Sequence, residues 1–341
     1  LGNGINPQDM IRKYGADSLR FTLAAFAAMG RDIRMSEERI EGYRHFVNKV
    51  WNASRFALMN LPEQGEPKAV DLGAVKGLHN KWILNRLEEI KAEEDAALES
   101  YRFNDAAQCV YKFLWNEFCD WYLELIKADM KEGEAKEEAQ YVLYTVLREI
   151  LLLLHPMIPF VTAEVWNALP GHEGTDIATQ LYPEFRPQCV KSRESDDMVF
   201  LQEAISAIRT IRAELNIKPS YRLSVVLHPA SDEQSALLEV NRGFFDLARL
   251  ESLTIDRNAH APKASASNVV RGCEVIVLLT GAVDFKAELA RLDKEIGKVD
   301  KDLAALDAKL SNENFVKRAP ADLVESEKAR HADLIDKKAK M

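Results

Sequence analysis

The chain has 341 residues, of which 47% are hydrophobic and 29% charged, and its formal net charge is −9. This length predicts two or three domains of ordinary globular composition. No apolar run approaches the roughly 20 residues that cross a bilayer, and the run at 150–154 is stopped by His155-Pro156. The acidic balance argues against a general nucleic-acid coat protein, although the first 60 residues hold nine Lys and Arg against six Asp and Glu.

The four cysteines contain no C-x-x-C pair: Cys109, Cys119, Cys189 and Cys273. Their scatter argues against a zinc site and predicts buried thiols in a reducing, cytoplasmic setting. The chain begins with Leu1-Gly2-Asn3 instead of Met and has no signal peptide. We therefore expect it to be the middle of a longer polypeptide, with part of its function elsewhere.

The first 35 residues predict two helices. Asn6 is placed to cap the first helix, Pro7 to begin it and Gly15 to end it. Asp17 is expected to cap a nearly all-apolar second helix, SLRFTLAAFAAM, which is therefore expected to be buried. Gly30 and the charged residues 31–34 lead to Ser36, which is placed to start a third helix.

The stretch 42–61 predicts a long helix with two unlike faces, since residues on a helix advance by about 100° each. The apolar face comprises Ile40, Tyr43, Phe46, Val47, Val50, Trp51, Ser54, Ala57 and Leu58. The other face comprises Arg44, His45, Asn48, Lys49, Asn52, Arg55 and Phe56. Cations hold phosphates, amides read base edges, and an unburied ring stacks on an unpaired base. The second face is thus a candidate single-stranded RNA reader, and an ordinary solvated face is the alternative.

A loop at 62–71 is followed by helical patterns at 74–99, 104–130, 135–154 and 159–169. The second of these patterns carries six aromatic residues: Tyr111, Phe113, Trp115, Phe118, Trp121 and Tyr122. At helical spacing such a patch favours core packing over a base-stacking platform. Residues 170–187, rich in Gly and Pro, predict a linker.

Beyond the linker the pattern predicts a small α/β module. An amphipathic helix is expected at 196–216, followed by strands at 222–228, 252–256 and 274–279. A further helix is expected between the first two strands, at 232–247.

The last segment predicts a coiled coil. Its apolar residues are spaced alternately by four and three: Phe285, Leu289, Leu292, Ile296, Val299, Leu303, Leu306 and Leu310. A turn at 311–319 and a second helix from Pro320 predict an antiparallel hairpin. The second seam is more polar: Val324, Glu327, His331, Leu334, Lys338 and Met341. A dimerisation rod is the alternative.

Four groups of motifs resemble class I aminoacyl-tRNA synthetases of the Val/Ile/Leu/Met group. Leu1-Gly2-Asn3 resembles the end of KMSKSLGN, and residues 14–20 resemble the family's YGADALR. Three stretches are similar to the anticodon-binding helical bundle of this group: FVNKVWNASRF, FCDWYLE and HPMIPFVTAEVW. GAVDFKAELARLDKEI and KLSNENFVKRAP are similar to the coiled-coil arm of bacterial valyl-tRNA synthetases.

The resemblance implies a mainly α protein in four parts. These are a helical segment at 1–35 that follows the catalytic domain, an anticodon-binding bundle at 36–190, an α/β module at 191–280 and a coiled-coil arm at 281–341. The family's anticodon-reading helix has its Lys and Phe at what are here Lys49 and Phe56, beside amides that match Asn48 and Asn52. With Arg44 and Arg55, these residues are the expected tRNA-binding set. The arm is expected to contact the tRNA elbow.

The resemblance also implies what is missing. In this family the HIGH and KMSKS motifs bind ATP, which the parent enzyme uses with Mg. Both motifs and the editing domain would lie before Leu1. Within the chain we expect no catalytic residue, cofactor or metal, since no phosphate loop, metal-spaced cluster or nucleophile–base pair is present in the sequence. Asp120, Glu124 and His155 are expected to be structural.

We therefore expect the C-terminal fragment of a valyl-type synthetase, inactive alone and monomeric, with tRNA(Val) as its partner and neither DNA nor a membrane. Two alternatives stay open. An isoleucyl-type fragment would be expected to carry a cysteine-rich zinc module. A non-catalytic helical scaffold would use the coiled coil to bind protein.

Overall fold

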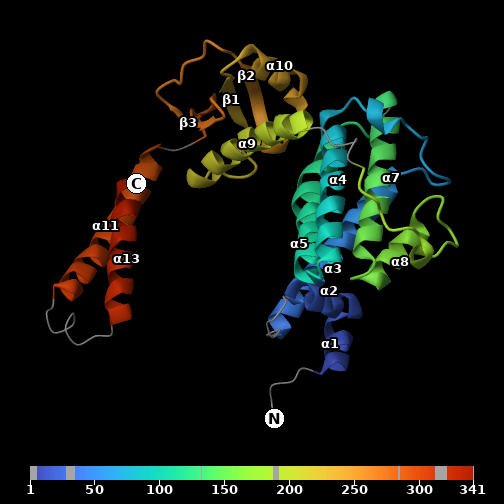
Figure 1. The fold of residues 1–341 in the computed structure, drawn as a ribbon. Coiled ribbons are helices and arrows are strands. Elements are labelled where there is room, and N and C mark those ends of the chain that lie inside the picture. The colour runs from blue at the N-terminus through green and yellow to red at the C-terminus, as the bar shows by residue number, and fades with distance from the viewer. Residues whose placement is uncertain are drawn as a thin grey trace. The chain divides into compact units, whose positions relative to one another are not determined.

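The computed structural model describes residues 6–27, 35–131, 133–186, 192–282, 285–311 and 321–340. The described chain is mainly helical, with a four-stranded sheet (Figure 1). It divides into two compact units. The first comprises Leu1–Ser206 and Ala236–Ala248, and the second comprises Ala207–Ser235 and Arg249–Met341.

The first two helices are α1 (Pro7–Tyr14) and α2 (Ala16–Phe26). Asn6 caps α1 as predicted, since its side chain accepts a hydrogen bond of 3.1 Å from the Gln8 backbone N–H. Gly15 ends α1 at a φ of +89°, a conformation that a side chain makes costly. The residues expected to leave α2, Gly30 and 31–34, lie outside the described part.

Asp17 does not cap its own helix, and that prediction was wrong. It lies inside the first turn of α2, and its carboxylate accepts from the backbone N–H groups of Phe160 and Val161, at 3.2 and 2.7 Å. These groups begin α8 (Pro159–Ala168). The acidic side chain thus satisfies the free N–H groups of a helix 143 residues away in sequence.

The rest of the first unit is a bundle of long helices (Figure 1). Its main members are α3 (Glu37–Asn60), α4 (Leu78–Glu99), α5 (Phe103–Lys112) and α7 (Glu134–Leu154). Ser36 caps α3 as predicted. The loop expected at 62–71 is present and leads into the short turn η1 (Leu72–Ala74). The part of the chain expected as linker contains the short turn η3 (Ile177–Thr179).

The single helix predicted at 104–130 is divided. After α5 the chain forms a π-helix, η2 (Phe113–Tyr122), and then the short α6 (Leu123–Leu125). Three of the six members of the aromatic patch are fully buried: Phe113, Phe118 and Tyr122. The other three stay partly exposed and pack against the core: Tyr111, Trp115 and Trp121. All six thus pack in or against the core, as predicted.

A buried ionic cluster ties the segment after α8 to the bundle. Lys91 on α4 lies 2.6 Å from Glu88 and 2.9 Å from Glu149 on α7. Arg186, from the predicted linker, contacts the same two carboxylates at 2.8 and 3.3 Å. Removing one member of such a cluster leaves a buried charge uncompensated, so these groups hold the linker against α4 and α7.

The second unit contains the sheet, whose strand order is β2-β1-β4-β3. The strands are β1 (Leu223–His228), β2 (Leu250–Ile255), β3 (Ser265–Val270) and β4 (Cys273–Leu278). β1 pairs parallel to β2 and antiparallel to β4, and β3 completes the edge. Three strands were predicted, and β3 was missed because SASNVV has little apolar alternation.

Two further predictions in this region need adjustment. The helix expected at 196–216 is α9 (Ser192–Glu214), two to four residues earlier at its ends. The helix expected at 232–247 is divided into α10 (Asp232–Val240) and the 3-10 helix η5 (Arg242–Ala248).

The last two helices are α11 (Phe285–Leu310) and α13 (Ala321–Lys340), which lie side by side (Figure 1). Three ion pairs join the two helices: Lys309–Glu327 at 2.6 Å, Asp307–His331 at 2.8 Å and Asp300–Lys338 at 2.6 Å. From one pair to the next, the residue number falls along α11 and rises along α13, so the paired stretches run in opposite directions. Among the described side chains, the buried ones are all predicted seam residues: Val299, Leu306 and Val324. Most of the predicted turn, from 312, and Pro320 lie outside the described part.

Three of the cysteines are described, and all three are free thiols: Cys109, Cys119 and Cys273. Cys119 and Cys273 are buried as predicted, Cys109 is partly exposed, and Cys189 lies outside the described part. In the described helices, no stretch combines the length and the apolar character needed to cross a membrane.

Candidate nucleic-acid interface

A ladder of aromatic rings holds α3 in place. The Phe46 ring of α3 lies 4.7 Å, between centroids, from Phe21 of α2 and 4.7 Å from Tyr111 of α5. Tyr111 in turn stacks on Trp115 of η2 at 5.8 Å. Because such pairs prefer defined geometries, the ladder fixes the rotation of α3 and therefore which of its residues face outward.

The predicted binding face of α3 is largely open to solvent. Arg44, Asn48, Asn52 and Arg55 are exposed, and Lys49 and Phe56 are partly buried. The opposite arc is buried as expected at Ile40, Phe46, Val50, Ser54 and Ala57. The helix therefore presents its cations and amides outward, with Lys49 and Phe56 at the boundary with the bundle.

Trp51 was assigned to the buried face, and the structure corrects this. Its side chain is 40% exposed, and Met59, two turns further on, is 80% exposed. On a helical wheel Trp51 lies at one border of the outward arc and Phe56 at the other, about 140° apart. The sequence pattern could not show this, because a Trp beside apolar neighbours has the signature of a core residue.

Lys49 bridges α3 and η2. Its ammonium lies 3.0 Å from Asp120 and 4.9 Å from the centroid of the Trp115 ring. Asp120 thus pairs with Lys49 in the free protein. A partly exposed pair of this kind contributes little to stability, because water competes for both charges.

Phe56 has a second lysine over its ring. The ammonium of Lys127, just after α6, lies 5.6 Å from the ring centroid and 2.6 Å from each carboxylate oxygen of Glu124. Glu124 was expected to be structural, and Lys127 was not among the predicted binding residues. The sequence pointed to Lys127 only by its position at the end of an aromatic helix. A single sequence does not show that residues 127 and 56 are in contact.

Buried titratable groups behind this edge stay uncharged. Burial raises the pKa of the Cys119 thiol to about 12, although the nearby Lys49 opposes the shift. Burial also raises the pKa of the Tyr43 hydroxyl, which accepts a hydrogen bond of 3.1 Å from the Gln108 amide. The charges offered at the surface are therefore those of the exposed lysines, arginines and carboxylates.

His155 is structural, as expected. Its Nδ1 lies 2.8 Å from the Thr162 hydroxyl, which joins the end of α7 to α8. Burial lowers the pKa of the His155 imidazole. The ring is therefore neutral at pH 7 and orders a helix junction.

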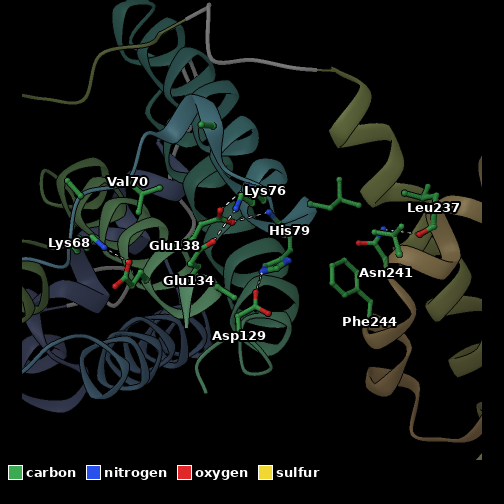
Figure 2. Close-up of a pocket in the computed structure, with 17 residues that line it drawn as sticks. Lys68, Val70, Lys76, His79, Asp129, Glu134, Glu138, Leu237, Asn241 and Phe244 are labelled. Atoms are coloured by element: carbon green, nitrogen blue, oxygen red, sulfur yellow. Dashed lines mark hydrogen bonds and ion pairs between the residues drawn. The ribbon is translucent and has the colours of Figure 1, made fainter. Parts of the chain in front are cut away.

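A cavity of about 820 Å³ lies elsewhere in the first unit (Figure 2). Figure 2 shows the carboxylate of Asp129 directed at the His79 ring, whose Nε2 lies 2.8 Å away. Glu138 accepts from the backbone N–H groups of Lys76 and Gly77, both at 2.9 Å. The contacts of Glu138 join the chain before α4 to α7, and no nucleophile with a base is among the residues that line the cavity.

The described residues contain no group of three or more His, Cys, Asp or Glu side chains arranged to hold a metal ion.

Comparison with protein families gives two matches. Residues 80–227 match the anticodon-binding domain of tRNA ligases, and residues 284–341 match the valyl tRNA synthetase tRNA binding arm. The first match includes η2 and α6 and begins after α3, which packs against η2.

Three similar proteins are valine–tRNA ligases. The chain is 65% identical to the valine–tRNA ligase of Nitratidesulfovibrio vulgaris, over 100% of the chain and 39% of that protein. It is 46% identical to that of Geobacter sulfurreducens, over 99% of the chain and 38% of the relative. It is 42% identical to that of Syntrophotalea carbinolica, over 98% of the chain and 38% of the relative. The chain thus spans less than two-fifths of the length of these relatives.

The family matches define the class: the chain carries an anticodon-binding domain and a tRNA-binding arm of the tRNA ligases. Within that class, the chain belongs to the valine–tRNA ligase family, to whose C-terminal part it corresponds. All three relatives are valine enzymes, which agrees with the valyl-type expectation over the isoleucyl-type alternative.

Proposed function

We propose that this chain is the tRNA-binding portion of an enzyme that attaches valine to tRNA(Val) with ATP. The main support is its 65% identity, along its whole length, to a valine–tRNA ligase. The ATP-binding and editing sites of the parent are expected in the part of the relatives that this chain does not span. The chain alone is therefore expected to bind tRNA without charging it.

The binding edge that we propose lies along α3 beside η2. Phe56 would stack on an unpaired anticodon base, and the exposed amides of Asn48 and Asn52 would read base edges. Three cations would hold phosphates: Arg44, Lys49 and Arg55. The observation that carries this assignment is the outward position of the amides and arginines, with Lys49 and Phe56 at the edge of the same arc.

We also propose that α11 and α13 form the antiparallel coiled-coil hairpin expected from the heptads, and that it contacts the outer corner of the tRNA. The cross-helix ion pairs and the buried seam residues support this pairing. A helix of this length spans about 40 Å. Two tethered contacts on one RNA raise the overall affinity through effective concentration.

We propose that the protein works as a cytoplasmic monomer, without DNA or a membrane as partner. An antiparallel hairpin satisfies its own seam and needs no second chain. Sedimentation equilibrium is expected to give the monomer mass. A doubled mass that depends on residues 284–341 would favour the scaffold alternative.

The proposed function is tested by titrating tRNA(Val) with the wild-type chain and with Phe56→Ala and Lys49→Ala. Loss of stacking is expected to cost roughly 1–3 kcal/mol, or about 5–150-fold in Kd. Lys49→Ala is expected to weaken binding more at low salt than at high salt. tRNA(Ile) serves as competitor and is expected to displace tRNA(Val) poorly. Unchanged affinity of both variants would refute the assigned roles.

A further inference from the structure

The strongest unassigned feature lies at the junction of α3 with the chain after α6. The Lys127 ammonium lies over the Phe56 ring, 5.6 Å from its centroid, and donates to both carboxylate oxygens of Glu124. We infer that Lys127 is a further tRNA-binding residue, which leaves the Phe56 ring when a base stacks there and binds the phosphate of that nucleotide. This inference rests on the proposed function of the α3 edge.

Position and exposure allow this movement. The Lys127 side chain is 49% exposed and that of Glu124 is 44% exposed, so their ion pair lies in solvent. Exposed ion pairs contribute little, because water competes for both charges. A lysine has a flexible four-carbon stem with its charge at the end, so its ammonium can move while its backbone stays fixed.

The balance of interactions favours the exchange. A base and an ammonium compete for the same ring face, and base–aromatic stacking is stronger than an exposed cation–π contact. The displaced ammonium remains beside the nucleotide that displaced it. A phosphate oxygen offers it a charge-assisted partner in place of Glu124.

The same combination of groups occurs a second time along this edge. Lys49 lies over the Trp115 ring and is paired with Asp120, as Lys127 lies over Phe56 and is paired with Glu124. Asp120 and Glu124 are four residues apart, so the two carboxylates follow one another along η2 and α6. Each carboxylate neutralises a lysine while RNA is absent. The edge thus holds two cations beside rings, ready to exchange partners.

The experiment measures Kd for the anticodon stem-loop of tRNA(Val) at several KCl concentrations, with the full chain. Lys127→Met keeps the length of the side chain and removes its charge. It is expected to weaken binding and to reduce the slope of log K against log salt by about 0.7, the value of one single-strand phosphate contact. Lys127→Arg is expected to keep the wild-type slope.

Lys68→Met is the matched control. Lys68 is also an exposed lysine paired with a glutamate, at 2.7 Å from Glu137, and it lies outside the α3 edge. It is expected to leave both Kd and slope unchanged. The melting temperature of each variant separates structure from binding, because a merely structural role would lower that temperature without changing the salt slope.

Two further variants test the exchange itself. Glu124→Gln frees Lys127 and removes a charge that repels phosphate, so tighter binding is expected. In the double variant Phe56→Ala with Lys127→Met, the combined loss is expected to be smaller than the product of the single losses, because the lysine contact depends on the stacked nucleotide.

The outcomes distinguish the two proposals. If Phe56→Ala weakens binding while Lys127→Met has the wild-type Kd and slope, the inference about Lys127 is wrong and the proposed function stands. If Phe56→Ala, Lys49→Ala and Lys127→Met all bind as the wild type, the proposed edge itself is wrong.

Discussion

At the scale of single residues, the binding edge is defined by how its two lysines are held. Lys49 and Lys127 each lie between a ring and a carboxylate, in contacts that are weak in water. A lysine fixed in a buried ion pair could not exchange partners cheaply, as Lys91 illustrates with its nearly complete burial between Glu88 and Glu149. Lys49 and Lys127, at 32% and 49% side-chain exposure, are held far more loosely than Lys91, at 1%.

The two rings that border the outward arc of α3 are predicted to behave differently. Phe56→Ala removes the ring on which a base is proposed to stack, and Lys127 lies beside that ring. We therefore expect tRNA binding to weaken about 5–150-fold. Trp51→Ala removes a more exposed ring at the other border of the arc and is expected to change Kd by less than about twofold. Filter binding with tRNA(Val) at constant salt gives both values. A larger loss from Trp51→Ala would place the stacking site at the other border.

Glu94 is predicted to make stability fall as pH rises. It is buried on α4, and burial raises the pKa of its carboxyl to about 8, against about 4.3 in the unfolded chain. Below pH 4 both states are protonated. Between pH 4.3 and 8 the unfolded state loses the proton that the folded state keeps, so the free energy of unfolding decreases by up to about 1.4 kcal/mol per pH unit.

Urea unfolding at pH 5 and pH 8 measures this effect. Glu94→Gln cannot ionise, so its stability is expected to decrease less than that of the wild type over this range. The exposed neighbour Glu93 supplies the control, since Glu93→Gln is expected to follow the wild-type pH dependence. Equal pH dependence in all three proteins would show that the Glu94 carboxyl is ionised in the folded state.

At the scale of elements, the bundle is joined by contacts between helices that are distant in the sequence. Asp17 of α2 caps α8, Arg186 joins the linker to α4 and α7, and the aromatic ladder joins α2, α3 and α5. α3 is thus held on several sides while its outward arc stays open. A rigid helix with an open arc suits recognition, because its backbone is already ordered and binding has to order only the side chains.

Asp17→Ala is predicted to lower the free energy of unfolding by about 0.5–2 kcal/mol, the usual cost of losing a helix cap. Two backbone N–H groups of α8 lose their acceptor. Asp9, an exposed residue of the first turn of α1, provides the control: Asp9→Ala is expected to change stability by less than about 0.5 kcal/mol. Urea denaturation followed by circular dichroism measures both. Equal stability of the two variants would contradict the cap.

At the scale of the whole molecule, the proposed function assigns different parts of one tRNA to different parts of the chain. The α3 edge belongs to the first unit, and α11 and α13 belong to the second. The family matches follow the same division, with an anticodon-binding match and an arm match at separate positions. Each contact can be weak singly, because binding of one raises the local concentration of the other.

Removal of residues 284–341 is predicted to weaken binding of intact tRNA(Val) and to leave binding of the isolated anticodon stem-loop unchanged. The stem-loop lacks the elbow that the arm is proposed to contact, so only the intact RNA loses a second contact. Comparing Kd for the two RNAs with each protein provides the measurement. Equal weakening for both RNAs would show that the arm supports the bundle and does not touch the elbow.

Local chemistry in the sequence determined much of the fold. Capping predicts the helix starts at Asn6 and Ser36, and the conformational freedom of glycine predicts the end of α1 at Gly15. Alternation of apolar residues predicts three of the four strands. All three effects act within a few residues. The outward position of Arg44 and Asn48 follows in the same way from helical periodicity. The predicted roles of these residues in tRNA binding remain predictions.

Tertiary structure decided the features that depend on partners distant in sequence. Asp17 caps α8 instead of its own helix, because the free N–H groups of α8 lie within reach of its carboxylate. A π-helix at Phe113–Tyr122 changes the angular phase along the segment, so a wheel drawn at 100° per residue misplaces the residues after α5. Lys127 reaches Phe56 only because α3 packs beside η2, which leads through α6 to Lys127. Periodicity gives the face of a helix, but only packing determines what lies against that face.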